Sequence, residues 1–248
     1  MYAQTAKKPN PLLRNGAYGI VMKGVHFCTR GCASLRGRNS APLCCIKLDT
    51  ATDLCCGYGE MLKIWHEAFD IRGLGVDICS EFIEVGKKRI AENAISGITL
   101  IEADIFKWQT DEKFDYVCLS GEDFGGFQNT IELLEKYVKP NGKLIIGTRY
   151  SKVEVPPKEL IEFEGETLPL IEINRIIRSK DYYITSMAAD TQAEWERYIM
   201  WSAKRHLNDL RKSPENQSLR EWCDKWYDMY FNYRRPYEGY VTVVIEKL

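Results

Sequence analysis

The chain has 248 residues, a composition ordinary for a soluble protein, and a formal net charge of −1 at neutral pH. This length suits one α/β domain with an insertion, or one domain plus a small cap. No apolar run approaches the ~20 residues that a membrane-spanning helix needs, so we expect no membrane partner.

The small net charge hides an asymmetry along the chain. Residues 1–48 contain eight Lys and Arg and no Asp or Glu, whereas the remaining 200 residues carry a net charge of −9. An acidic body disfavours nucleic acid as a partner and favours a small-molecule substrate. The nine cysteines, an odd number, suit a reducing cytosol, so we predict a cytoplasmic protein.

Residues 1–45 read as an irregular, basic N-terminal arm, because breakers interrupt them and no helical or alternating period persists. Cys28, Cys32 and the Cys44-Cys45 pair match no zinc-ligand spacing well. Incidental thiols are therefore favoured over a metal cluster, and we expect no metal.

The stretch from residue 49 to residue 78 predicts a strand, a tight turn, a helix and a second strand. Residues 52–55 are short and mostly apolar, as in a buried parallel strand, and Cys56-Gly57-Tyr58-Gly59 forms the turn. Residues 60–69 carry apolar side chains at helical spacing, and a strand ends on Asp77.

This arrangement predicts a nucleoside cofactor. Glycines at a helix start let a ligand approach free backbone N–H groups. Asp77 comes 18 residues after Gly59, where an acid can accept hydrogen bonds from a ribose diol. The third glycine of a dinucleotide motif is replaced by Leu62, which counts against a nicotinamide oxidoreductase.

The run D-L-C-C-G-Y-G-E resembles motif I of class I S-adenosylmethionine-dependent methyltransferases, D/E-x-G-x-G-x-G. Asp53, Gly57 and Gly59 match, Cys55 stands at the first glycine and Met61 at the third. The resemblance implies that the backbone at Gly57 and Gly59 holds the methionine end of S-adenosyl-L-methionine.

The predicted third strand, residues 98–101, leads to Asp104 and Ile105. In the family, an acid here meets the adenine amino group and its neighbour packs on the ring, while Asp77 would bind the ribose hydroxyls. Alternatives are a helix cap for Asp104 and plain core for Ile105. The resemblance implies these cofactor-binding residues: Asp53, Cys55, Gly57, Gly59, Asp77, Ile78, Asp104, Ile105 and Ser120.

A fourth strand, residues 114–120, precedes a glycine-rich loop that contains Glu122 and Asp123. Ligands of open α/β sheets bind outside the carboxyl ends of the strands, so substrate and sulfonium should meet at this loop. As catalytic candidates, Glu122 and Asp123 would offset the sulfonium charge or accept a proton from the substrate. The alternative is that Glu122 and Asp123 cap the next helix.

Further along, the sequence predicts a helix at 129–138, a turn at 139–143 and a fifth strand at 144–148. The segment V-K-P-N-G-K-L-I-I resembles a structural segment of the same family. Residues 150–180 read as a surface loop or lid element, with a helix at 170–177. The sixth strand is expected at 181–189.

Residues 191–236 predict a helical cap with many aromatic side chains, inserted before an alternating last strand at 240–246. The methyltransferase domain would then comprise residues 46–190 and 237–248. Gly59-Glu60-Met61-Leu62 and Trp195-Glu196-Arg197-Tyr198 resemble a group of uncharacterised bacterial methyltransferases, the YjhP-like group, over about residues 46–248.

We therefore expect an α/β fold: a Rossmann-like, mostly parallel class I methyltransferase sheet with an antiparallel last strand and a helical cap between the last two strands. The expected activity is methyl transfer from S-adenosyl-L-methionine to a small molecule. The absence of a D/N-P-P-Y/W tetrapeptide argues against methylation of adenine or of cytosine N4. The alternative is a catalytically impaired cofactor-binding or regulatory module of the same fold.

Overall fold

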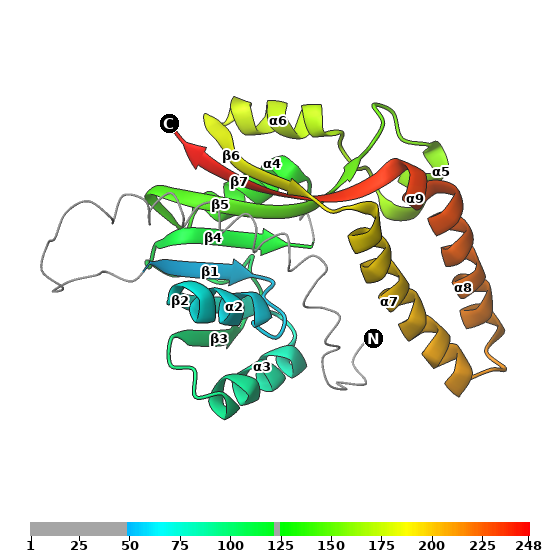
Figure 1. The fold of residues 1–248 in the computed structure, drawn as a ribbon, viewed down its shortest axis with the longest axis horizontal. Coiled ribbons are helices and arrows are strands. Elements are labelled where there is room, and N and C mark those ends of the chain that lie inside the picture. Colours follow the sequence, from blue (N-terminus) through cyan, green and yellow to red (C-terminus); the bar gives the residue numbers. More distant parts are fainter. Residues whose placement is uncertain (1–48, 122–124) are drawn as a thin grey trace, which may run out of the picture.

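The computed structural model describes residues 49–121 and 125–248, and in these ranges it forms a seven-stranded sheet with helices on both faces (Figure 1). The strand order is β3-β2-β1-β4-β5-β7-β6, and β7 runs antiparallel to both of its neighbours while the other pairs are parallel. The predicted fold class is confirmed. The predictions for residues 1–45 and for Glu122 and Asp123 lie outside the described residues.

The elements follow one another in the alternating order of a doubly wound sheet. In chain order they are β1 (Thr50–Leu54), α2 (Glu60–Phe69), β2 (Arg72–Asp77), α3 (Ser80–Glu92), β3 (Ile98–Glu102), β4 (Phe114–Ser120), α4 (Phe127–Glu135), β5 (Val138–Ser151), α5 (Lys158–Glu164), α6 (Leu170–Ser179), β6 (Tyr182–Ala189), α7 (Gln192–Lys212), α8 (Gln217–Met229), η2 (Tyr230–Arg234), α9 (Arg235–Tyr237) and β7 (Glu238–Lys247).

Two apolar cores lie on opposite faces of the sheet, and β4 shows how alternation produces them. Tyr116 and Cys118 pack with Trp65 of α2 on one face, whereas Val117 and Leu119 pack with α4 and α6 on the other. Successive strand side chains point to opposite faces, so a strand covered by helices on both sides is apolar throughout.

Three predictions were wrong in detail. Helix α4 covers residues 127–135 instead of 129–138. The fifth strand already begins at Val138, so the segment 139–143 belongs to β5. The last strand does not alternate: β7 is buried from Glu238 to Ile245, because it lies between β5 and β6.

The helices α7 and α8 form an arm between β6 and β7. They pack against each other and extend beyond the carboxyl ends of β1 and β4 (Figure 1). At the root of this arm, Trp195, Trp226, Tyr230 and Tyr240 share a third apolar cluster. The role of the arm as a substrate cap stays a prediction. In the described parts of the chain, no helix has the length and apolarity needed to cross a membrane.

A buried network of alternating charges lies beside the root of the arm. Arg149 Nη1 lies 3.1 Å from a carboxylate oxygen of Glu164 and 2.9 Å from one of Glu238. Arg234 lies 3.0 Å from Glu164 and 2.9 Å from Glu238. The sequence had suggested that Glu164 belongs to a surface loop. Instead, Glu164 ends α5, and its ion pairs join that helix to β5 and η2.

Replacing Glu238 by Ala should lower the free energy of unfolding by about 3 kcal/mol, because it removes the fully buried carboxylate of the network and leaves both arginines with Glu164 alone. Urea denaturation measures the loss. Glu162→Ala is the matched control, since Glu162 pairs with Lys158 at the exposed surface of α5. Equal effects of the two substitutions would show that the network does not stabilise the fold.

Candidate active site

The bend between β1 and α2 is the first part of the site. Gly57 and Gly59 have φ angles of 55° and 71°, in the left-handed region that favours glycine. Cys55, at the first glycine position of the motif, also lies there, with φ of 65°. The N–H groups of Cys55 and Cys56 both donate to the carbonyl oxygen of Val76, at 2.8 and 3.1 Å. Cys55 therefore adopts the left-handed backbone conformation that glycine favours, so the bend forms although the first glycine of the motif is a cysteine.

Asp77 clamps this bend to the end of β2. Its buried carboxylate accepts the Gly57 N–H at 2.8 Å and the Cys79 N–H at 2.9 Å. A carboxylate has about four lone-pair positions, so these two bonds leave acceptor capacity for hydroxyl groups. The predicted ribose contact of Asp77 is compatible with this geometry and stays a prediction.

Asp104 and its neighbours form a turn after β3. One carboxylate oxygen of Asp104 accepts the Phe106 N–H at 3.0 Å, and the other lies 3.3 Å from Lys107 Nζ. Asp104 therefore stabilises a turn and not the start of a helix, so the helix-cap alternative is wrong, and its adenine contact stays a prediction. Ile105 is 5% exposed and packs in the core, whereas Ile78 and Phe106 are 71% and 62% exposed.

These residues share one edge of the sheet. β1, β2 and β3 are parallel neighbours, so the glycine bend, Asp77 and Asp104 all follow carboxyl ends (Figure 1). Ser120 ends β4, the strand next to β1, and lies at the same edge. Glu122 and Asp123 fall outside the described residues, and their catalytic role stays a prediction.

The structure adds a residue that sequence reasoning missed. The hydroxyl oxygens of Ser120 and Tyr240 lie 2.8 Å apart, although 120 positions separate them in the chain. Only the strand order reveals this pair, because β5 alone lies between β4 and β7. The sequence placed Tyr240 in the last strand and gave no signal of its partner.

Asp53 is a buried carboxyl group in β1. It is 3% exposed and lies opposite Cys118 of β4 in the parallel register. Burial and the nearby charge of Asp77 raise the pKa of Asp53 from 3.8 to about 8, and a hydrogen bond with Cys118 offsets part of the shift. At neutral pH, Asp53 is therefore largely protonated.

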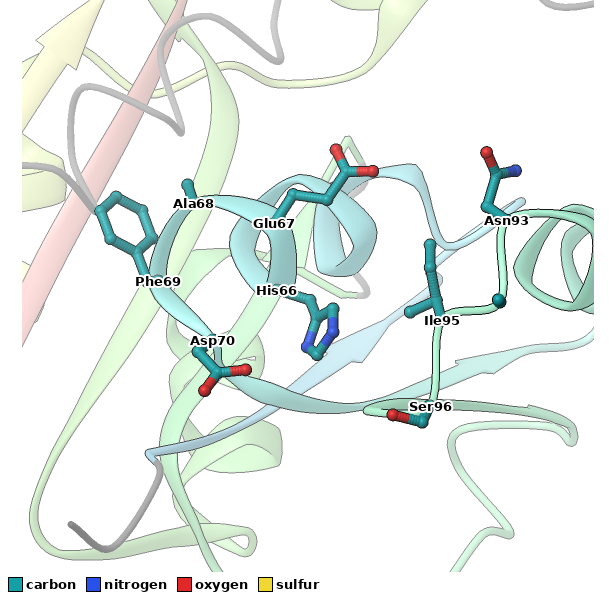
Figure 2. Close-up of a pocket in the computed structure, with 9 residues that line it drawn as sticks. His66, Glu67, Ala68, Phe69, Asp70, Asn93, Ile95 and Ser96 are labelled. Carbon is teal, nitrogen blue, oxygen red and sulfur yellow. The ribbon is translucent and has the colours of Figure 1, made fainter.

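A shallow pocket lies far from this edge. Figure 2 shows it at the end of α2, where His66, Asp70 and Asn93 contribute to its lining. Because α2 starts at the carboxyl edge and runs back along the sheet, this pocket lies at the opposite, amino edge. His66 Nδ1 lies 3.0 Å from the Ile71 carbonyl oxygen, which fits a structural role for His66.

In residues 49–121 and 125–248, no cluster of three or more His, Cys, Asp or Glu is placed to hold a metal ion.

The raised pKa of Asp53 predicts a pH-dependent stability. The folded chain binds this proton more tightly than the unfolded chain, so the stability contribution of Asp53 is lost as pH rises from about 4 to about 8. We expect Asp53→Asn to gain stability relative to the wild type across this window, as measured by urea denaturation at several pH values. Asp111→Asn, at an exposed position, is the control. A constant difference between wild type and Asp53→Asn would contradict the shift.

Comparison with known proteins agrees with this geometry. A family model described as a methyltransferase domain matches residues 47–212. The Escherichia coli protein YjhP is 30% identical over 154 residues, which cover 59% of this chain and 62% of YjhP. The matched region thus spans about three fifths of that relative.

Solved structures share the fold. A methyltransferase from Geobacter sulfurreducens, in complex with S-adenosyl-L-homocysteine, superposes with a TM-score of 0.74 at 24% identity, covering 89% of this chain and 90% of its own. The crystal structure of YjhP superposes equally well, with a TM-score of 0.74 at 24% identity and coverage of 90% and 91%. With the family model matching most of its length, this chain belongs to the methyltransferase domain family.

Proposed function

We propose that this protein transfers a methyl group from S-adenosyl-L-methionine to a small-molecule acceptor. The observation that carries the proposal is the bend at the carboxyl edge, in which Asp77 holds Gly57 and Cys79 by their N–H groups. Such a bend offers backbone close to a ligand and a carboxylate beside it.

Each residue at this edge would contact a different part of the cofactor. Backbone at Gly57 and Gly59 faces the methionine end, Asp77 the ribose hydroxyls, and Asp104 the adenine amine. When bound, the cofactor supplies a methyl group on a positively charged sulfur. The protein then has to align the acceptor with that methyl group and exclude water.

Two features support a small acceptor and an active enzyme. Residues 49–248 carry a net charge of −9, which disfavours a nucleic-acid substrate. Cys55 keeps the left-handed conformation of the glycine that it replaces, so the bend is formed.

A relative from Priestia megaterium, a malonyl-[acyl-carrier protein] O-methyltransferase, is 28% identical over 99 residues, which cover only 35% of that protein. Its substrate is therefore no guide to the acceptor here.

Two experiments test the proposal. Calorimetry measures S-adenosyl-L-homocysteine binding, and incubation with labelled S-adenosyl-L-methionine and a cell metabolite extract measures methyl transfer. We expect S-adenosyl-L-homocysteine to bind and label to pass into a small molecule. Binding without transfer would favour the alternative, a catalytically impaired module of the same fold. Failure of the wild type to bind S-adenosyl-L-homocysteine would refute both.

Asp77→Ala should weaken S-adenosyl-L-homocysteine binding by about tenfold to a hundredfold, because hydrogen bonds to a charged group contribute about 1.5–3 kcal/mol. Comparing the affinities of adenosine and 2′,3′-dideoxyadenosine distinguishes a lost hydrogen bond to the ribose from the loss of the hydrogen bonds that hold the bend. Wild type should prefer adenosine, and the variant should lose this preference. Glu67→Ala, on the exposed surface of α2, is the control. If the preference survives in Asp77→Ala, this carboxylate does not bind the ribose.

The exposed Ile78 and Phe106 side chains are candidates to cover the adenine ring. Replacing either by Ser should weaken S-adenosyl-L-homocysteine binding about fivefold, the equivalent of about 1 kcal/mol of apolar contact, with little change in stability. Ile105→Ala should instead lower the free energy of unfolding by about 2–4 kcal/mol, because Ile105 is buried. Leu248→Ser, at an exposed apolar side chain that follows the end of β7 at the opposite edge of the sheet, is the control. Unchanged affinity in both Ser variants would remove Ile78 and Phe106 from the site.

A further inference from the structure

The hydroxyl pair of Ser120 and Tyr240 is built into the carboxyl edge of the sheet. Tyr240 reaches from β7 across β5 to the end of β4, and Gly147 of β5 lies directly below the contact. A Cβ atom on Gly147 would collide with both hydroxyl oxygens. The pair therefore requires a glycine at this position, and the strand provides one.

The arm shields one side of this pair. Trp195 of α7 stacks on Tyr240 with ring centroids 5.8 Å apart, and Tyr198 stacks on Trp195 at the same distance. Tyr240 is buried, whereas Ser120 is half-buried. Ser120 is thus the member of the pair that a ligand at this edge can reach.

Ser120 also lies where the acceptor should meet the cofactor. Leu119 pairs with Leu54 in the parallel register, so Ser120 is level with Cys55 at the glycine bend. Directly after it, the Gly121 N–H donates to the Gly147 carbonyl oxygen at 3.2 Å. This bond fixes the start of the loop that follows β4.

The pair is suited to donate a hydrogen bond. Burial raises the pKa of the Tyr240 phenol well above its usual value, so Tyr240 stays protonated at neutral pH. The bond between the two hydroxyls uses only one of their two O–H groups. When Tyr240 donates to Ser120 Oγ, the Ser120 O–H remains to donate to a ligand. Oxygen accepts such a bond much better than sulfur does.

We propose that Ser120, held in place by Tyr240, donates a hydrogen bond to an anionic oxygen of the methyl acceptor, a carboxylate or a phenolate. This inference rests on the proposed function and names the acceptor class of the same site. The acceptor oxygen forms the new bond to the methyl carbon while the carbon–sulfur bond breaks and its electron pair stays on sulfur. Because the oxygen is already ionised, no proton has to leave it. Tyr240 acts through Ser120 and is a positioning residue.

Calorimetry on the full chain tests the assignment. Protein saturated with S-adenosyl-L-homocysteine is titrated with benzoate, 4-nitrophenolate and, as a cationic comparison, benzylamine. We expect the wild type to bind at least one of the two anions in the millimolar range or tighter, and to bind benzylamine more weakly. Ser120→Ala and Tyr240→Phe should each weaken anion binding about tenfold or more.

The pair has its own internal controls. The double variant should be no weaker than Ser120→Ala alone, because the two residues act as one unit. Ser120→Thr keeps the hydroxyl and should restore anion binding. Tyr183→Phe removes a phenol hydroxyl at the other end of the sheet, near the start of β6, and should bind the anions like the wild type. In Tyr183→Phe, S-adenosyl-L-homocysteine affinity should also stay within about twofold of the wild type.

Several results would overturn the inference. If the wild type binds S-adenosyl-L-homocysteine but neither anion, the acceptor class is wrong. If Ser120→Ala weakens S-adenosyl-L-homocysteine and leaves anion binding intact, Ser120 belongs to the cofactor site, as its sequence position first suggested. If the wild type does not bind S-adenosyl-L-homocysteine at all, the proposed function fails, which is a distinct outcome.

Discussion

The hydrogen bonds from Gly57 and Cys79 to Asp77 are the constraint on which the candidate site depends. One carboxylate joins the glycine bend to the end of β2, and α2 then starts directly after the bend. The first N–H groups of a helix have no helical partner, and Gly59, the N-cap of α2, makes no side-chain capping hydrogen bond. The apolar residues of α2 pack on the sheet, while its first turn faces the carboxyl edge.

Asp53 and Asp77 show how position alone gives two neighbouring acids different tasks. Asp77 accepts two backbone N–H groups and so holds the glycine bend to the end of β2. Asp53 lies deeper, opposite Cys118, and the negative charge of Asp77 makes ionisation of Asp53 still less favourable. A protonated Asp53 can thus remain in the core of β1, and Asp77 is left as the carboxylate nearest to the bend.

Local patterns made much of the fold predictable. The motif around Gly57 and Gly59 identified the bend, and short apolar runs identified most strands, because both depend on neighbours in sequence. Long-range features were not predictable in this way. The Ser120–Tyr240 pair and the ion pairs of Glu164 depend on which strands become neighbours. Likewise, the sequence of β7 suggested a half-exposed strand, because its position between β5 and β6 is a property of topology.

The start of β7 connects the arm to the acceptor side of the edge. Glu238 and Tyr240 are two positions apart, so both side chains lie on the same face of the strand. Glu238 holds Arg149 and Arg234 at the root of the arm, while Tyr240 holds Ser120 and stacks on Trp195 of α7. A shift of the arm would therefore move Ser120 before it disturbed the clamp at Asp77, which lies on strands β1 and β2. This separation fits the proposal that the acceptor lies on the side of Ser120 and the cofactor on the side of Asp77.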